Sequence, residues 1–87
     1  MTIEQFNFNR SFGARCKNNR KSFGLSQDDV CNALVPYRVV FVRESYSNIE
    51  NGKRSVTLFE AIALAKVLNI DLSSYYAPAA YAAASIQ

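Results

Sequence analysis

The sequence predicts a compact all-α domain, a bundle of five short helices. In several segments apolar residues recur at the three- and four-residue spacing of an amphipathic helix, and residues suited to helix ends separate those segments. A length of 87 residues, with 49% hydrophobic and 20% charged side chains, is that of a single ordinary globular domain. These observations favour short helices joined by tight turns around one core.

The first helix is expected over residues 10–23. Asn9 or Ser11 is placed to cap its start, and Phe12 begins a face that points into the core. Gly24 follows at the position where many helices end in a left-handed residue, a conformation that glycine adopts at little cost.

The second helix is expected over residues 26–35. Ser26 can accept a hydrogen bond from the amide of Asp29, and acidic residues in the first turn suit the positive end of the helix dipole. Pro36 then ends the helix, because the residue before a proline is disfavoured in helical conformation.

Two further helices have clear ends. The pair Asn51 and Gly52 is interpreted as a helix C-cap and not as a hairpin turn, because no alternating apolar pattern flanks it. Thr57 and Glu60 form a capping box at the start of the clearest helix in the chain, residues 57–68.

The end of the chain divides into a last helix and a tail. Asn69 suits a left-handed cap, and Asp71 is placed to cap a short helix over residues 72–76. The helix-rich domain is therefore expected to span residues 1–76. Residues 77–87 are apolar and almost uncharged, so they are a candidate dimer contact; the alternative is that they pack back onto their own domain.

Residues 39–42, Val-Val-Phe-Val, do not fit the helical pattern. Four β-branched or aromatic residues in a row predict a buried strand by propensity. No second stretch of similar quality is available to pair with it, so these residues need another place in the fold.

Positive charge gathers in one part of the chain. Residues 10–54 hold nine basic and four acidic residues, a net charge of +5, whereas the remainder holds one basic and three acidic residues, a net charge of −2. This asymmetry suits a protein that faces a polyanion on one side. The alternative is a solvated basic face with no partner.

Several classes of protein are disfavoured. The chain has no histidine and only two cysteines, Cys16 and Cys31, which are expected to be free thiols in a reducing compartment. A zinc site needs about four ligands and general-base catalysis most often uses histidine. We therefore expect no metal, no cofactor and no enzymatic activity. No apolar run approaches the ~20 residues of a membrane span and no signal peptide is evident, so a cytoplasmic location without membrane contact is expected.

Three motifs in order resemble the XRE family of lambda-repressor- and Cro-like helix-turn-helix domains. They are GLSQ at residues 24–27, SNIENGKR at residues 47–54 and the capped helix of residues 57–68. The resemblance covers about residues 10–76. It implies a five-helix, lambda-repressor-like domain whose second and third helices form the helix-turn-helix, with the third in the major groove of double-stranded DNA.

The resemblance also implies two sets of DNA-contacting residues. Arginine can bond guanine, asparagine can read adenine and glutamate can accept from cytosine. The expected base contacts are Arg43, Glu44, Ser47 and Asn48, with Tyr46 and Ile49 facing inward. The expected phosphate contacts are Ser26, Gln27, Arg38, Asn51, Lys53 and Arg54. Without the resemblance, Arg43, Glu44 and Asn48 are ordinary solvated helix surface. The alternative for Asn51, Lys53 and Arg54 is a helix C-cap followed by basic residues that suit the helix dipole.

Two features of the family's interior are expected from the same comparison. Arg20 and Glu50 match an intramolecular ion pair that fixes the orientation of the third helix; the alternative is two unrelated surface charges. Cys31 stands where the family usually has alanine and fits as a small apolar residue. Asn19 stands where an apolar residue is common, so we expect a thinner core there.

The chain departs from the family between its second and third helices. It has about five additional residues, roughly residues 36–40, so that Phe41 takes the apolar position of the turn and Val42 the capping position. Because valine cannot cap a helix, the third helix is expected to start either at Arg43 or at Ser45. We expect Phe41 and one or two of the neighbouring valines to pack on the core, and Arg38 to point toward the DNA backbone.

The function implied by the resemblance is that of a sequence-specific transcriptional regulator. The simplest action for so small a protein is repression, as a homodimer on a pseudo-palindromic operator. The alternative is a protein-interaction module with the same fold, such as an antitoxin, in which residues 35–42 contact a protein partner.

Overall fold

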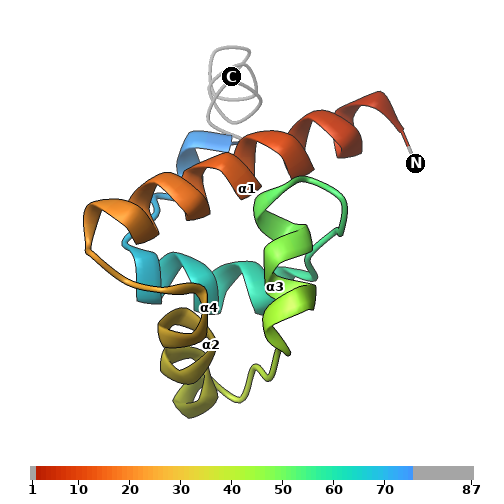
Figure 1. The fold of residues 1–87 in the computed structure, drawn as a ribbon. Helices are drawn as coiled ribbons and strands as arrows, with labels where there is room; N and C mark the ends of the chain where they lie inside the picture. The colour runs from red at the N-terminus through yellow and green to blue at the C-terminus, as the bar shows by residue number, and fades with distance from the viewer. Residues whose placement is uncertain (1, 76–87) are drawn as a thin grey trace.

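The computed structural model describes residues 2–75, which contain α-helices and one short 3-10 helix and no strand. The elements are α1 (Ile3–Ser22), α2 (Gln27–Leu34), η1 (Val35–Tyr37), α3 (Arg43–Glu50) and α4 (Leu58–Leu68) (Figure 1). Residues 73–75 are helical as well. The predicted compact all-α bundle is confirmed.

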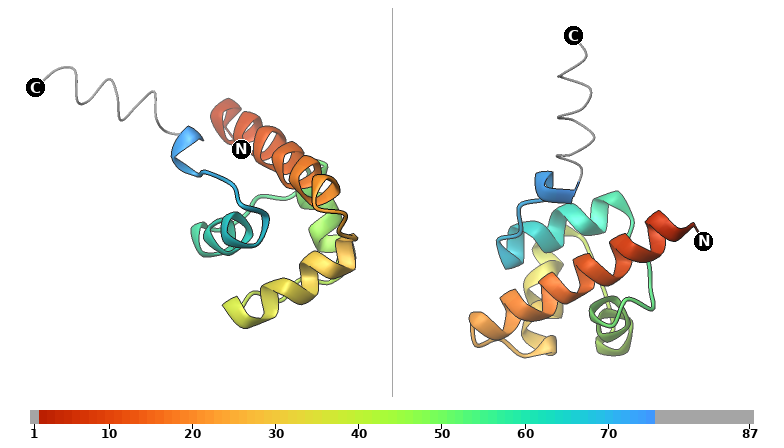
Figure 2. Two further views of the ribbon diagram at one scale, coloured as in Figure 1. Left: turned by 90° about the vertical axis from the view of Figure 1, so that its left-hand side faces the viewer. Right: turned by 90° about the horizontal axis from the view of Figure 1, so that it is seen from above.

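The helices surround one core. α1 packs on α3 and α4 from one side, and α2 packs on the same two helices from the other (Figures 1 and 2). Each of the four α-helices contributes two or more fully buried side chains. The largest of them are Phe12, Cys16, Val30, Leu34, Tyr46, Ile49, Leu64 and Leu68. No helix within residues 2–75 has both the length and the apolar character needed to cross a bilayer.

α1 begins seven residues earlier than predicted. Thr2 is its N-cap and accepts a hydrogen bond from the amide of Gln5 at 3.1 Å, so the prediction that Asn9 or Ser11 caps the helix is wrong. Asn9 is instead buried inside the helix, and its Nδ2 donates to Ser55 Oγ at 3.0 Å. The reason is tertiary: a polar residue that can cap also fits mid-helix when a partner from another segment satisfies it.

The other helix ends follow the local signals. Gly24 and Gly52 adopt φ values of +71° and +74°. Both close Schellman motifs, since Leu25 N donates to Arg20 O at 3.0 Å and Lys53 N donates to Asn48 O at 2.8 Å. The predicted C-caps after α1 and α3 are therefore confirmed.

Capping boxes are present at α2 and α4. Ser26 exchanges hydrogen bonds with Asp29, and Thr57 exchanges them with Glu60. Asn69 is left-handed with φ of 55°, as expected.

The last predicted helix begins as expected. Asp71 Oδ1 accepts a hydrogen bond from the amide of Ser73 at 3.0 Å. The end of that helix and the predicted tail, residues 77–87, lie outside the described residues.

The segment between α2 and α3 has a strand-like alternation without being a strand. η1 follows α2 directly and ends at Arg38, which is left-handed with φ of 63°. Val39 and Phe41 are 4% and 8% exposed, whereas Val40 and Val42 are 80% and 68% exposed. Phe41 and one valine thus pack on the core, as predicted. Alternate residues face inward, but no strand within residues 2–75 pairs with them.

α3 starts at Arg43, the earlier of the two expected positions. Val42 has the extended conformation of an N-cap, with φ −76° and ψ 153°, but no side-chain hydrogen bond caps the helix.

Asn19, where we expected a thinner core, makes a hydrogen bond to α4. Its Nδ2 donates to the carbonyl oxygen of Leu68 at 2.8 Å and so ties α1 to the last turn of α4. A polar side chain is tolerated there because it satisfies a carbonyl that has no partner inside the helix.

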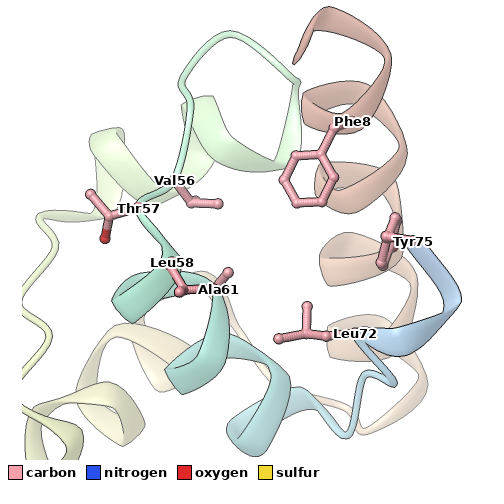
Figure 3. A pocket seen from close by; sticks show the side chains of 7 residues that line it. All are labelled: Phe8, Val56, Thr57, Leu58, Ala61, Leu72 and Tyr75. Atoms are coloured by element: carbon pink, nitrogen blue, oxygen red, sulfur yellow. The ribbon is translucent and has the colours of Figure 1, made fainter. Parts of the chain in front are cut away.

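An apolar pocket of about 150 Å³ lies between α1, α4 and the segment that follows α4 (Figure 3). Phe8, Leu72 and Tyr75 line one part of it, and Leu58 and Ala61 of α4 line another. The rings of Phe8 and Tyr75 meet edge to face, with centroids 5.3 Å apart. The last described residue therefore packs on α1.

Candidate nucleic-acid interface

The four predicted base-contacting residues lie together on the outer face of α3. Arg43 and Glu44 are exposed and Ser47 and Asn48 are half-buried. With Gln27 of α2 they line an open hollow of about 400 Å³. The other face of the helix is held in the core, where Tyr46 and Ile49 are fully buried.

A second hollow adjoins the first one at the N-terminus of α2. It has a volume of about 320 Å³ and shares Gln27 and Arg43 with the first hollow. Its other lining residues are Arg20, Ser26 and Asp28. The two hollows together form a polar surface that runs from the start of α2 along α3.

The orientation of α3 is fixed from behind by a buried carboxylate. Glu50 accepts hydrogen bonds from Arg20 Nε at 2.6 Å and from Arg20 Nη2 at 3.1 Å, and its side chain is 2% exposed. Gln27 Nε2 donates to the same carboxylate at 3.0 Å, and Arg20 Nη1 donates to Leu25 O at 2.9 Å. One network thus joins α1, α2 and α3 behind the polar surface.

The charges of this network suit a buried ion pair. Burial alone would raise the pKa of Glu50, but the interactions with Arg20, with the Tyr46 hydroxyl and with Gln27 outweigh it and hold the pKa below its usual value. Burial, and next the adjacent Glu50 carboxylate, raise the pKa of the Tyr46 phenol. Burial also raises the pKa of the Cys16 thiol to about 12, so this cysteine is an inert part of the core.

Gln27 keeps a free donor for an anion, whereas Ser26 is engaged with Asp29. The Ser26 oxygen accepts the Asp29 amide at 3.0 Å, and its hydroxyl also faces the Asp29 carboxylate. Gln27 uses Nε2 for Glu50, and an amide nitrogen carries a second hydrogen. The Asp29 carboxylate folds back onto the Ser26 amide, whose hydrogen bond lowers the pKa of this carboxyl.

The remaining predicted phosphate contacts differ in their surroundings. Arg38, Asn51 and Lys53 are exposed. Arg54 is half-buried: its guanidinium carbon lies 5.0 Å from the centroid of the Phe41 ring, and Nη1 is 3.5 Å from Glu60 Oε1. Arg54 is therefore engaged with the protein itself.

Sequence reasoning missed one residue and one contact that shape this surface. A Cβ on Gly13 would lie 2.1 Å from the carbonyl oxygen of Ile49, so the backbones of α1 and α3 touch there. The contact of Arg54 with Phe41 was also missed. Neither has a local signal, because the partners are 13 or more positions apart in the chain.

Residues 2–75 hold no cluster of three or more side chains of the types that ligate metals.

Comparison with known proteins gives one match. A family model described as helix-turn-helix matches residues 17–74, which is more than half of the chain. No curated protein and no solved structure matches. Together with the fold, this match shows that the chain belongs to the XRE-like helix-turn-helix family of the lambda-repressor and Cro type, a family of DNA-binding regulatory domains and not of enzymes.

Proposed function

We propose that this protein is a sequence-specific repressor that places the outer face of α3 in the major groove of an operator. The observation that carries the proposal is the polar hollow of Gln27 and four α3 side chains, backed by a buried face of the same helix. A groove-reading helix needs this division, because base edges offer hydrogen bonds while the inner face must hold the helix in place.

Each base-contacting residue has a role set by its chemistry. Arg43, at the first position of α3, has a guanidinium that can bond guanine O6 and N7 together. Asn48 can pair its amide with adenine, and Glu44 can accept from cytosine N4. Ser47 is short and can bond either kind of base edge at close approach.

Phosphates are bound on both sides of α3 in this proposal. Gln27 supplies a donor beside Ser26 at the N-terminus of α2, where the helix dipole also favours an anion. Arg38 precedes α3, and Asn51 and Lys53 follow it, so the backbone of one DNA strand can be held at two points.

The protein acts as a homodimer on a pseudo-palindromic site. Two copies of one domain bind half-sites about one helical turn apart, and the two-fold symmetry of the protein is mirrored in the operator. The apolar tail, residues 77–87, is the proposed dimer contact, since it follows a segment that already packs on α1 beside an apolar pocket.

The test is selection of binding sites from a pool of random DNA duplexes. Enrichment of an inverted repeat is expected, with affinity that falls steeply between ~50 and ~200 mM salt. Asn48→Ala is expected to lose discrimination at one base pair of each half-site, by about 1–3 kcal/mol. Enrichment of no duplex at ~50 mM salt would sink the proposal.

A second candidate function is a protein-interaction module. Four apolar side chains of the segment 35–42 are exposed, and Tyr37 shares a shallow hollow of about 160 Å³ with Phe59 and Ile62 of α4. Such contiguous apolar surface marks partner sites in other proteins. The same selection experiment separates the two functions, because a module of this kind enriches no DNA sequence.

A further inference from the structure

No side-chain hydrogen bond caps the N-terminus of α3. Its N-cap, Val42, offers no side-chain hydrogen bond, and the residues before it form an extended segment with alternate side chains in solvent. In a helix without a capping side chain, the first turn frays more easily. The position of Arg43 and Glu44 therefore depends on whatever holds the preceding residues.

Phe41 is the residue that holds this segment, and Arg54 lies over its ring. The side chain of Phe41 is 8% exposed, and the guanidinium carbon of Arg54 is 5.0 Å from its ring centroid, within the range of a cation–π interaction. Phe41 stands two positions before α3 and Arg54 stands four positions after it. The contact thus ties together the two segments that flank this helix.

Besides the Phe41 ring, the Arg54 guanidinium contacts a carboxylate of α4. Its Nη1 lies 3.5 Å from Glu60 Oε1 and 3.4 Å from the carbonyl oxygen of Ser55. Glu60 Oε1 also accepts the amide of Thr57 at 3.0 Å in the capping box of α4. The guanidinium is therefore placed between a well-anchored carboxylate and an aromatic ring.

We propose that Arg54 is a positioning residue that sets the start of α3 through Phe41, in place of a side-chain cap, and thereby tunes which bases α3 reads. This inference rests on the proposed function, because it assigns α3 to base recognition. It gives Arg54 a different role from the phosphate contact that the family resemblance implies.

The first experiment uses free protein and needs no DNA. The amide of Tyr46 donates to Val42 O at 3.1 Å and is the first helical hydrogen bond of α3. In Arg54→Gln and in Phe41→Leu, exchange of this amide is expected to accelerate about 5-fold or more relative to the core amides of α1, which report global unfolding. The neighbouring exposed residue provides the control: Lys53→Gln should leave the ratio unchanged. Equal exchange ratios in all variants would overturn the proposal.

The second experiment measures binding to a selected duplex and to a random duplex. Arg54→Gln is expected to lower the ratio of the two affinities about 5- to 10-fold, with little change in the salt dependence. In the Phe41→Leu background it should lower that ratio no further. A phosphate contact behaves differently: affinity falls alike on both duplexes, the salt slope drops by about 1, and the losses add in the double variant. That pattern would refute the positioning role.

Two further outcomes remain decisive. If the wild-type protein enriches no duplex, the proposed function fails, and the exchange experiment alone decides whether Arg54 holds the start of α3. If Phe41→Leu does not fold, Phe41→Met takes its place, since methionine fills a similar volume without offering an aromatic face.

Discussion

Gly13 is the residue at which α1 and α3 touch backbone to backbone. Its neighbours are the carbonyl oxygens of Ile49 and Glu50, 2.1 and 2.9 Å from where a Cβ would stand. Neither oxygen belongs to a flexible side chain that could move aside. A single hydrogen at this position therefore sets how closely α3 is held to the rest of the domain.

Gly13→Ala is expected to lower the free energy of unfolding by about 2–3 kcal/mol, because an added methyl group overpacks a backbone contact. Helix propensity alone predicts the opposite, a gain of ~1 kcal/mol. Gly24→Ala is the matched control: there is open space around this residue, so it should cost only the left-handed strain of ~1 kcal/mol. Urea denaturation measures both, and a stabilised Gly13→Ala would contradict the close approach of α1 and α3.

Glu50 makes the stability of the domain depend on pH. Its folded-state pKa lies below the ordinary value of 4.5, so ionised Glu50 stabilises the fold above about pH 4.5, and this contribution is lost as the pH falls through the lowered pKa. Glu50→Gln should be destabilised by about 3 kcal/mol at pH 7, since it leaves Arg20 without its charged partner. The difference from wild type should shrink toward pH 3. Denaturant melts at the two pH values check this, and a constant difference would count against the ion pair.

At the scale of the element, α3 is the helix whose ends are the most unequal. Its C-terminus closes with Gly52 in a Schellman motif, whereas its N-terminus begins at an uncapped valine. The additional residues before it explain this: they bring Phe41 onto the core and leave Val42 facing solvent at the capping position.

Val42→Ser should raise the free energy of unfolding by about 1 kcal/mol. The backbone of Val42 already has the extended conformation of an N-cap, and serine would supply the missing acceptor for an amide of the first turn. Val40→Ser is the control, because Val40 is also solvent-exposed but caps nothing, and it should change stability by less than ~0.5 kcal/mol. Thermal and urea melts of both variants measure the effect. No gain for Val42→Ser over Val40→Ser would mean that α3 does not begin at Arg43.

At the scale of the whole molecule, the charge asymmetry of the sequence can be traced to particular positions in the fold. The basic residues of the segment 10–54 include those on the polar surface of α2 and α3, while α4 carries one lysine, Lys66, beside an apolar hollow. In the proposed function, only the first group meets DNA phosphates.

Lys53→Gln and Lys66→Gln remove the same charge from the two regions. Lys53→Gln is expected to weaken DNA binding on every sequence and to reduce the slope of log affinity against log salt by about 1. Lys66→Gln should leave that slope unchanged. Fluorescence anisotropy at four or five salt concentrations measures both slopes. Equal slopes for the two variants would place the phosphate contacts elsewhere on the surface.

The sequence by itself determined the all-α class, the ends of most helices and the residues that α3 presents. These features depend on groups within three or four positions of one another, as in the capping boxes of Ser26 and Thr57 and the glycines at positions 24 and 52. The pair of Arg20 and Glu50 was also expected, because the family resemblance supplied the long-range partner.

Only the tertiary structure decided that Asn9 lies inside α1 and which way the segment between α2 and α3 faces. Asn9 lies within α1 because it is bonded to Ser55, and Phe41 faces inward because the core and Arg54 receive its ring. These choices depend on partners 13 to 46 positions away. Local propensity does not predict these choices, since the same residues could cap a helix or form a strand if the fold brought them different neighbours.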